Sequence, residues 1–194
     1  MQRDPVSAAR LMLPLALLVM GSALAQSPPR VTPPILSTDE CAVWARELSF
    51  AQSVADHDPA AFAGHLHPDA AFGASRAAPT RGRDAITRRW AGIIDGKAVA
   101  LSWYPTRVTI GPATANTAAG PAADIAWSSG PGLFEDRDPG ATVRYTLSTF
   151  HSVWHRGADG VWRVLFDDGT EPKPATDADV AAFHAGRRVA CPQR

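Results

Sequence analysis

The stretch TFHSVWHRGADGVWRVLFDDG, residues 149–169, decides the fold of this chain. Apolar and polar residues alternate on both sides of Gly157-Ala-Asp-Gly160, a pattern that predicts two antiparallel strands joined by a tight turn. A bare two-stranded hairpin is marginally stable in water, so its aromatic face must be covered by the rest of the chain. That face carries Phe150, Ser152 and Trp154 on the first strand and Trp162, Val164 and Phe166 on the second.

The residues before this hairpin predict helices first and strands afterwards. Ser37-Thr-Asp-Glu40 is a capping box, and the helix that it opens should end near Asp56. Asp58-Pro59 should start a second helix that extends to Leu66. A third helix is expected at 84–94 and a C-terminal one at 177–185. The expected strands are 70–74, 99–104, 107–110, 122–129, 141–155 and 161–168, with connections at 111–121 and 130–140.

This order predicts an α+β fold in which the helices pack on one face of a mostly antiparallel sheet. A strongly curved sheet wrapped around the long first helix would bury all of the apolar faces. We divide the chain into a signal peptide (1–25), a Pro-rich lead-in (26–36), one folded domain (37–169) and a C-terminal tail with a short helix (170–194).

The N-terminus predicts export. Arg3 and Arg10 give a positively charged start before the apolar run at Leu11–Met20. Ala23-Leu-Ala25 is typical of a cleavage site. The apolar run is too short to span a bilayer, so it predicts a secreted protein, placed in the bacterial periplasm, with no membrane association after cleavage.

Charge and cysteine content add two expectations. The 19 basic and 19 acidic residues give a net charge of zero, and without a basic stripe nothing indicates a nucleic-acid partner. Cys41 and Cys191 lie near opposite ends of the mature chain. In an oxidising compartment they are expected to form a disulfide, and two free buried thiols are the alternative.

Four motifs follow one another along the chain: His67-Pro-Asp-Ala-Ala-Phe72, Arg81-Gly-Arg-Asp-Ala-Ile86, Phe150–Trp154 and Gly160–Phe166. Their order resembles the nuclear transport factor 2-like superfamily, and within it the SnoaL-like branch known as domain of unknown function 4440. The resemblance covers about residues 39–169. It implies a cone-shaped fold whose curved sheet and three helices enclose a pocket. The superfamily includes isomerases, cyclases, hydrolases, dehydratases and proteins that only bind or dimerise.

An apolar pocket is the binding site that we expect, but the catalytic groups are hard to assign. Isomerase chemistry of this superfamily needs a carboxylate facing an apolar pocket together with hydrogen-bond donors. The short strand 70–74 offers no carboxylate, and Tyr104 and Tyr145 match no donor position. The expected pocket residues are Trp44, Leu48, Phe72, Trp90, Trp103, Phe150 and Trp154.

The weak catalytic candidates are His151, Asp167 and His67. If Phe150 and Trp154 face inward, His151 points outward, into solvent or a dimer interface. If the strand has the opposite pleat, Thr149, His151 and Asp167 line the pocket and form an acid–base pair. His67, with His65, forms an H-x-H pair that could hold a metal, but solvated histidines are the simpler interpretation.

The favoured hypothesis is therefore a secreted protein that binds a small apolar molecule, without cofactor or metal. A cofactor-independent enzyme of the ketosteroid isomerase, cyclase or hydrolase type is one alternative. A module that forms a homodimer through its outer sheet face is another. A cavity of a few hundred cubic ångströms with a carboxylate or imidazole at its floor would favour the enzyme.

Overall fold

The computed structural model describes residues 35–113, 115–117 and 120–192. The expected signal peptide and most of the lead-in fall on residues 1–34, outside the described residues. Within the described residues, no helix combines the length and apolarity that crossing a membrane requires.

The described residues contain four helices, and the ends of these helices follow from local sequence. Helix α1 (Thr38–Ala55) starts with the expected capping box of Ser37 and Glu40. Helix α2 (Pro59–Gly64) is capped by the Asp58 carboxylate. Helix α3 (Arg83–Asp95) ends at Gly96, whose φ of 67° suits a residue without a Cβ. Helix α4 (Asp177–Gly186) has a second capping box, from Thr176 to Asp179.

The strands form a mixed sheet in the order β2-β1-β9-β8-β7-β3, with β4 also paired to β7 and β10 to β8. All pairs are antiparallel except β1 with β9. A separate two-stranded sheet joins β5 to β6. The strands are β1 (Leu66–Phe72), β2 (Thr80–Arg81), β3 (Val99–Trp103), β4 (Arg107–Ile110), β5 (Ala115–Thr117), β6 (Gly120–Ala122), β7 (Ile125–Asp136), β8 (Tyr145–Arg156), β9 (Trp162–Gly169) and β10 (Lys173–Pro174).

Some expected boundaries need correction. The second helix ends at Gly64, and Leu66 belongs to β1, because the parallel pairing with β9 takes up this residue. Residues 130–136 lie in β7, although their Gly and Pro content indicated a connection. They remain in the strand because β7 and β8 pair without interruption from Ile125 opposite His155 to Glu135 opposite Tyr145.

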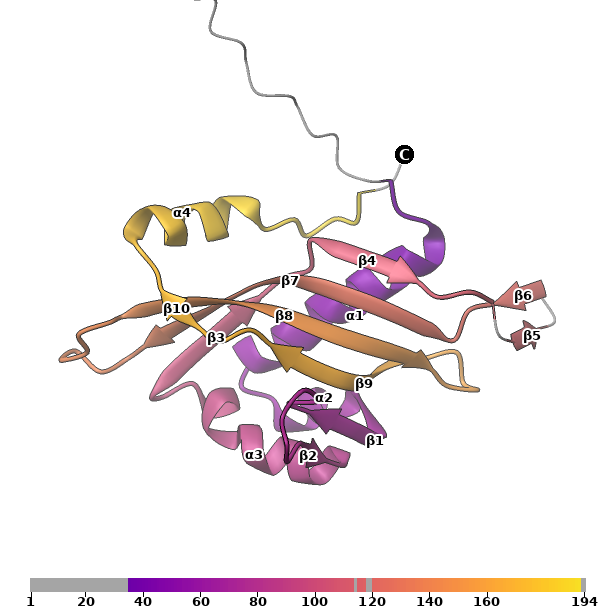
Figure 1. The fold of residues 1–194 in the computed structure, drawn as a ribbon, viewed down its shortest axis with the longest axis horizontal. Helices are drawn as coiled ribbons and strands as arrows, with labels where there is room; N and C mark the ends of the chain where they lie inside the picture. Colours follow the sequence, from indigo (N-terminus) through magenta and orange to yellow (C-terminus); the bar gives the residue numbers. More distant parts are fainter. Residues whose placement is uncertain (1–34, 114, 118–119, 193–194) are drawn as a thin grey trace, which may run out of the picture. The chain divides into compact units, whose positions relative to one another are not determined.

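Helix α1 packs on the inner face of the sheet, against β3, β4, β7 and β9 (Figure 1). The Trp154 side chain is fully buried, and its ring meets that of Phe50 edge-on at 6.2 Å between centroids. A hydrogen bond also links α1 to β9, since Arg46 Nε donates to the Trp162 carbonyl at 3.1 Å. The α+β class and the covering of the aromatic hairpin by the first helix are confirmed.

The disulfide between Cys41 and Cys191 is present, with a Cα–Cα distance of 5.5 Å. It joins the first turn of α1 to the C-terminal tail. The Leu36 N–H donates to the Pro192 carbonyl at 2.9 Å, so a backbone hydrogen bond lies beside the covalent link. The tail is therefore fixed to the start of the fold.

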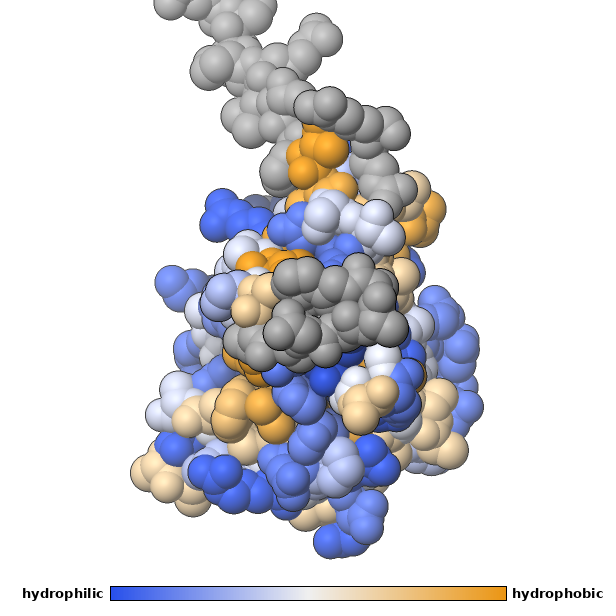
Figure 2. Space-filling view, turned by 90° about the vertical axis from the view of Figure 1, so that its right-hand side faces the viewer, coloured by the Kyte–Doolittle hydropathy of each residue, from blue (hydrophilic) through white to orange (hydrophobic). Residues whose placement is uncertain are grey.

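The opposite, outer face of the sheet is only partly covered. Helix α4 packs there through Phe183 and Val180 against Leu133, Tyr145 and Leu147. Tyr104 donates its hydroxyl to the Phe183 carbonyl at 2.8 Å, which fixes the helix. Figure 2 shows a different side of the molecule, the one on which β5 and β6 lie in Figure 1, and there hydrophobic residues form separate spots among hydrophilic ones.

His65 links α2 to α1 through contacts of its ring nitrogens, and we expect it to make the protein less stable in acid. Its Nδ1 lies 2.7 Å from the Ala61 carbonyl and its Nε2 lies 2.8 Å from Ser49 Oγ. Burial, helped by the Arg46 charge, lowers the pKa of His65 from 6.5 to about 4. Because protonation then favours the unfolded chain, His65 contributes its full stability above pH 6.5 and loses it as the pH falls toward 4.

Replacing His65 by Gln should therefore flatten the pH dependence of unfolding between pH 6.5 and 4, as measured by urea midpoints. Replacing His184 by Gln is the matched control, because it makes the same change at an exposed position on α4. An equal slope in wild type and His65→Gln would show that this imidazole does not titrate on unfolding.

Candidate functional site

A cavity of about 410 Å³ lies between the inner face of the sheet and the helices. Its lining includes six aromatic side chains, and its charged lining side chains come from three different segments. Arg76 follows β1, Arg89 lies on α3, and Asp167 and Asp168 end β9. The apolar lining residues are Phe50, Phe72, Trp90, Ile93, Leu101, Trp103, Phe134 and Phe150.

A β-bulge turns Asp167 into this cavity. Val153 pairs with Phe166, but Trp154 pairs with Val164, so Leu165 is an extra residue in β9. An extra residue reverses the alternation of the strand beyond it. Phe166 is consequently 41% exposed on the outer face, which corrects the expectation that it continues the inward face of the hairpin.

Asp167 is held by a row of polar residues on the inner face. Ser128, Ser152 and Asp167 lie opposite one another on the neighbouring strands β7, β8 and β9. Ser152 Oγ donates to Asp167 Oδ2 at 2.8 Å. Both serines are fully buried, whereas Asp167 is half-buried and reaches the cavity. The row therefore ends in a single carboxyl at the apolar pocket.

The surroundings of Asp167 favour its protonated form. Burial raises the pKa of this carboxyl well above its ordinary value of 3.8, and the nearby negative charges of Glu47 and Asp168 act in the same direction. The hydrogen bond from Ser152 opposes them without cancelling their effect. Asp168 behaves differently: burial would raise its pKa, but hydrogen bonds from Ser75 and the Arg76 charge lower it overall.

Glu47 of α1 holds one of the cavity-lining residues in place, a role that the sequence analysis did not predict. Its side chain is fully buried; Oε1 accepts from Trp103 Nε1 at 2.7 Å, and Oε2 from Ser128 Oγ at 2.6 Å. Ser128 Oγ in turn accepts from Trp154 Nε1 at 2.8 Å. Burial raises the pKa of Glu47 against these hydrogen bonds. Glu47 thereby fixes Trp103, a cavity wall, to both the helix and the sheet.

Four of the expected pocket residues, Phe72, Trp90, Trp103 and Phe150, line the cavity together with Asp167. The other three lie elsewhere. Trp44 and Leu48 face a separate open groove beside Arg187 and Cys191, because their side of α1 meets the C-terminal tail. Trp154 is packed within the core at 0% exposure.

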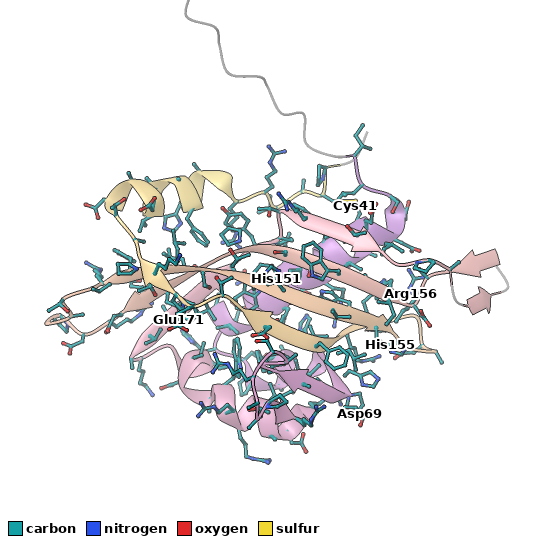
Figure 3. The ribbon with its side chains drawn as sticks, viewed as in Figure 1. Cys41, Asp69, His151, His155, Arg156 and Glu171 are labelled. Atoms are coloured by element: carbon teal, nitrogen blue, oxygen red, sulfur yellow. A yellow bond between two sulfur atoms is a disulfide. The ribbon has the colours of Figure 1, made fainter. Side chains whose placement is uncertain are left out.

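The two candidate histidines lie away from the cavity. His151 projects from the outer face, where its ring stacks on Trp127 at 5.8 Å between centroids (Figure 3). His67 meets His155 edge-on at 5.2 Å, and its Nδ1 accepts from the Asp69 N–H at 3.1 Å. Phe150 and Trp154 therefore face inward and His151 faces outward, as the first sequence alternative has it. Asp167 also faces inward, which only the second alternative contained.

The arrangement places a carboxyl with a raised pKa against a chamber with large aromatic walls. Such a carboxyl can donate a hydrogen bond or a proton, and after ionisation it can remove one. In the described part of the chain, no group of three or more His, Cys, Asp or Glu side chains is placed to hold a metal ion.

Comparison with known proteins agrees with this architecture. A protein of unknown function from Pseudomonas putida, described as NTF2-like (nuclear transport factor 2-like), aligns over 75% of this chain and 94% of its own length, with a TM-score of 0.53 and 15% identity. The chain has the nuclear transport factor 2-like fold. The sequence itself matches no family model and no curated protein.

Two further structures with this fold come from proteins named for an activity. A candidate scytalone dehydratase from Novosphingobium aromaticivorans aligns over 78% of this chain and 90% of its own length, with a TM-score of 0.53 and 14% identity. A candidate dehydratase from Streptomyces avermitilis aligns over 71% and 98%, with a TM-score of 0.52 and 16% identity. At such identities the likeness extends to the fold alone.

Proposed function

We propose that the chain is a cofactor-independent enzyme that binds a small, largely apolar molecule in the cavity and moves a proton on it with Asp167. The observation that carries this proposal is the Asp167 carboxyl itself. It faces an aromatic chamber of about 410 Å³, it is held by Ser152, and its pKa is raised well above 3.8.

Proton transfer is the reaction class that this geometry supports best. A carboxyl with a raised pKa is a better base when ionised and remains an acid at higher pH than an exposed one. Isomerisation next to a carbonyl and elimination of water both need such a group. The nuclear transport factor 2-like fold and the candidate dehydratases that share it are consistent with this class.

Ring opening of 5-nitrobenzisoxazole tests whether Asp167 can act as a base. A base removes the single carbon-bound proton of the isoxazole ring, and the N–O bond breaks to give a coloured nitrophenolate. We expect the wild-type rate to exceed the buffer rate and to rise with pH through the raised pKa of Asp167. Asp167→Asn should lower the rate about 100-fold or more, the range of general base catalysis.

Asp69→Asn is the matched control, because Asp69 is an exposed carboxylate on β1 that does not line the cavity. It should retain the wild-type rate. Equal rates for wild type and Asp167→Asn, or a wild-type rate no higher than that of buffer, would refute catalysis by this carboxyl.

Binding without chemistry is the second candidate function. It is favoured by the large aromatic and aliphatic side chains on the cavity wall, which can hold an apolar molecule without any reaction. A binding protein would take up apolar molecules equally well after Asp167→Asn, and it would not accelerate the ring opening.

Two finer assignments belong to the same proposal. We place the chain in the SnoaL-like branch known as domain of unknown function 4440, on the motifs at 67–72, 81–86, 150–154 and 160–166.

We also propose export to the periplasm, supported by the signal-like N-terminus and by the Cys41–Cys191 disulfide. N-terminal sequencing of the periplasmic protein should start at Gln26.

A further inference from the structure

Two guanidinium groups line the cavity in addition to the Asp167 and Asp168 carboxyls. Arg76 and Arg89 both contribute to its wall, and both side chains are largely exposed. They come from different segments, the loop after β1 and helix α3, and so approach the cavity from separate positions. Their exposure places them at its entrance, where the chamber opens to water.

The Arg76 side chain is held at this entrance by Gly73. A Cβ at position 73 would lie 2.9 Å from Arg76 Cδ, so the side chain lies directly over the glycine. Gly73 also has a φ of 68°, which a residue with a side chain rarely adopts. Arg76 has an anionic neighbour, because its charge helps to lower the pKa of Asp168.

Arg89 has no such neighbour. Within residues 35–113, 115–117 and 120–192, its side chain makes no hydrogen bond or ion pair. Trp90 and Ile93, which follow it on α3, are both cavity walls. The charge of Arg89 therefore lies at the edge of an aromatic chamber without an internal counter-ion.

The two guanidinium groups differ in their surroundings. Asp168 lies close enough to Arg76 for the two charges to interact, and the described partner of the Asp167 carboxyl is Ser152. Among the described residues, Arg89 forms no ion pair with either carboxylate. A planar carboxylate can accept two parallel hydrogen bonds from a guanidinium, which is the strongest geometry for this pair.

Resting on the proposed function, the geometry points to an aromatic carboxylate as the class of ligand, with its ring system between Trp90 and Trp103 and its carboxylate on Arg89. The apolar part of such a molecule replaces water against the aromatic walls. The charged end stays at the entrance, where it keeps part of its hydration.

Calorimetric titration of the full mature chain with two probes tests this assignment. The probes are 2-naphthoate and 2-naphthylmethanol, which have the same ring system and nearly the same size but differ in charge. We expect the acid to bind at least tenfold more tightly than the alcohol at low ionic strength. Added salt should reduce this preference because Arg89 is exposed.

Arg89→Gln should reduce the preference for the acid to within about twofold, because it weakens binding of the acid far more than binding of the alcohol. Arg88→Gln is the matched control, since Arg88 is the preceding residue on α3, is equally exposed and does not line the cavity. It should retain the wild-type preference.

Three results would contradict the assignment in distinguishable ways. Equal affinities for acid and alcohol would overturn the ligand class while leaving the apolar pocket in place. An undiminished preference in Arg89→Gln would overturn the role of this guanidinium. Binding of neither probe would overturn both the ligand class and the proposed small-molecule site.

Discussion

Replacing Trp154 by Ala is expected to lower the free energy of unfolding by about 3–5 kcal/mol, the usual range for removing a large buried aromatic side chain. Trp154 is fully buried in the hairpin, and its ring contacts Phe50 of α1. The same change removes the indole N–H that donates to Ser128 Oγ at 2.8 Å. Urea unfolding followed by circular dichroism measures the loss.

Trp127→Ala is the control for this prediction, because Trp127 lies on the neighbouring strand but is only half-buried, on the outer face against His151. Its loss should be smaller, about 1–2 kcal/mol. If Trp154→Ala does not fold, Trp154→Phe keeps a ring without the N–H and should fold with a smaller loss. An unchanged midpoint in Trp154→Ala would refute its place in the core.

Removing the disulfide should have the second large effect. The bond closes a loop with a sequence separation of 150 residues. For a loop of this length the chain-entropy model gives about 5 kcal/mol of stabilisation relative to the reduced chain. Cys41→Ala combined with Cys191→Ala should therefore unfold at a much lower urea concentration than the oxidised wild type.

Each single substitution breaks the same bond, so Cys41→Ala alone should lose nearly as much stability as the double variant. Reduction of the wild type should have a similar effect, and mass spectrometry under non-reducing conditions verifies its starting state. Oxidised wild type and double variant with the same midpoint would show that the link does not stabilise the fold.

The fold was largely predictable because its signals are local and agree with one another. The capping box at Ser37–Glu40 and the left-handed stop at Gly96 mark helix ends. The alternation around Gly157–Gly160 marks the hairpin. Residues 130–136 were less predictable, because their place in β7 depends on pairing with β8 over its whole length and not on their own composition.

The site was only partly predictable. Asp167 was among the candidates, but which face it occupies depends on the bulge at Leu165, and nothing in the local sequence indicates an extra residue there. Glu47 did leave a signal: it lies on the same helical stripe as Val43, Phe50 and Val54. A carboxylate inside an apolar stripe requires buried partners, and Trp103 and Ser128 supply them.

The carboxyl carbon resonance of Asp167, followed by NMR across a pH titration and assigned by its absence in Asp167→Asn, tests the central claim most directly. A midpoint well above 3.8 is the predicted result, because burial and the charges of Glu47 and Asp168 all disfavour ionisation. A midpoint at or below 3.8 would mean that water reaches this carboxyl freely, and the proposed proton transfer in an apolar chamber would be contradicted.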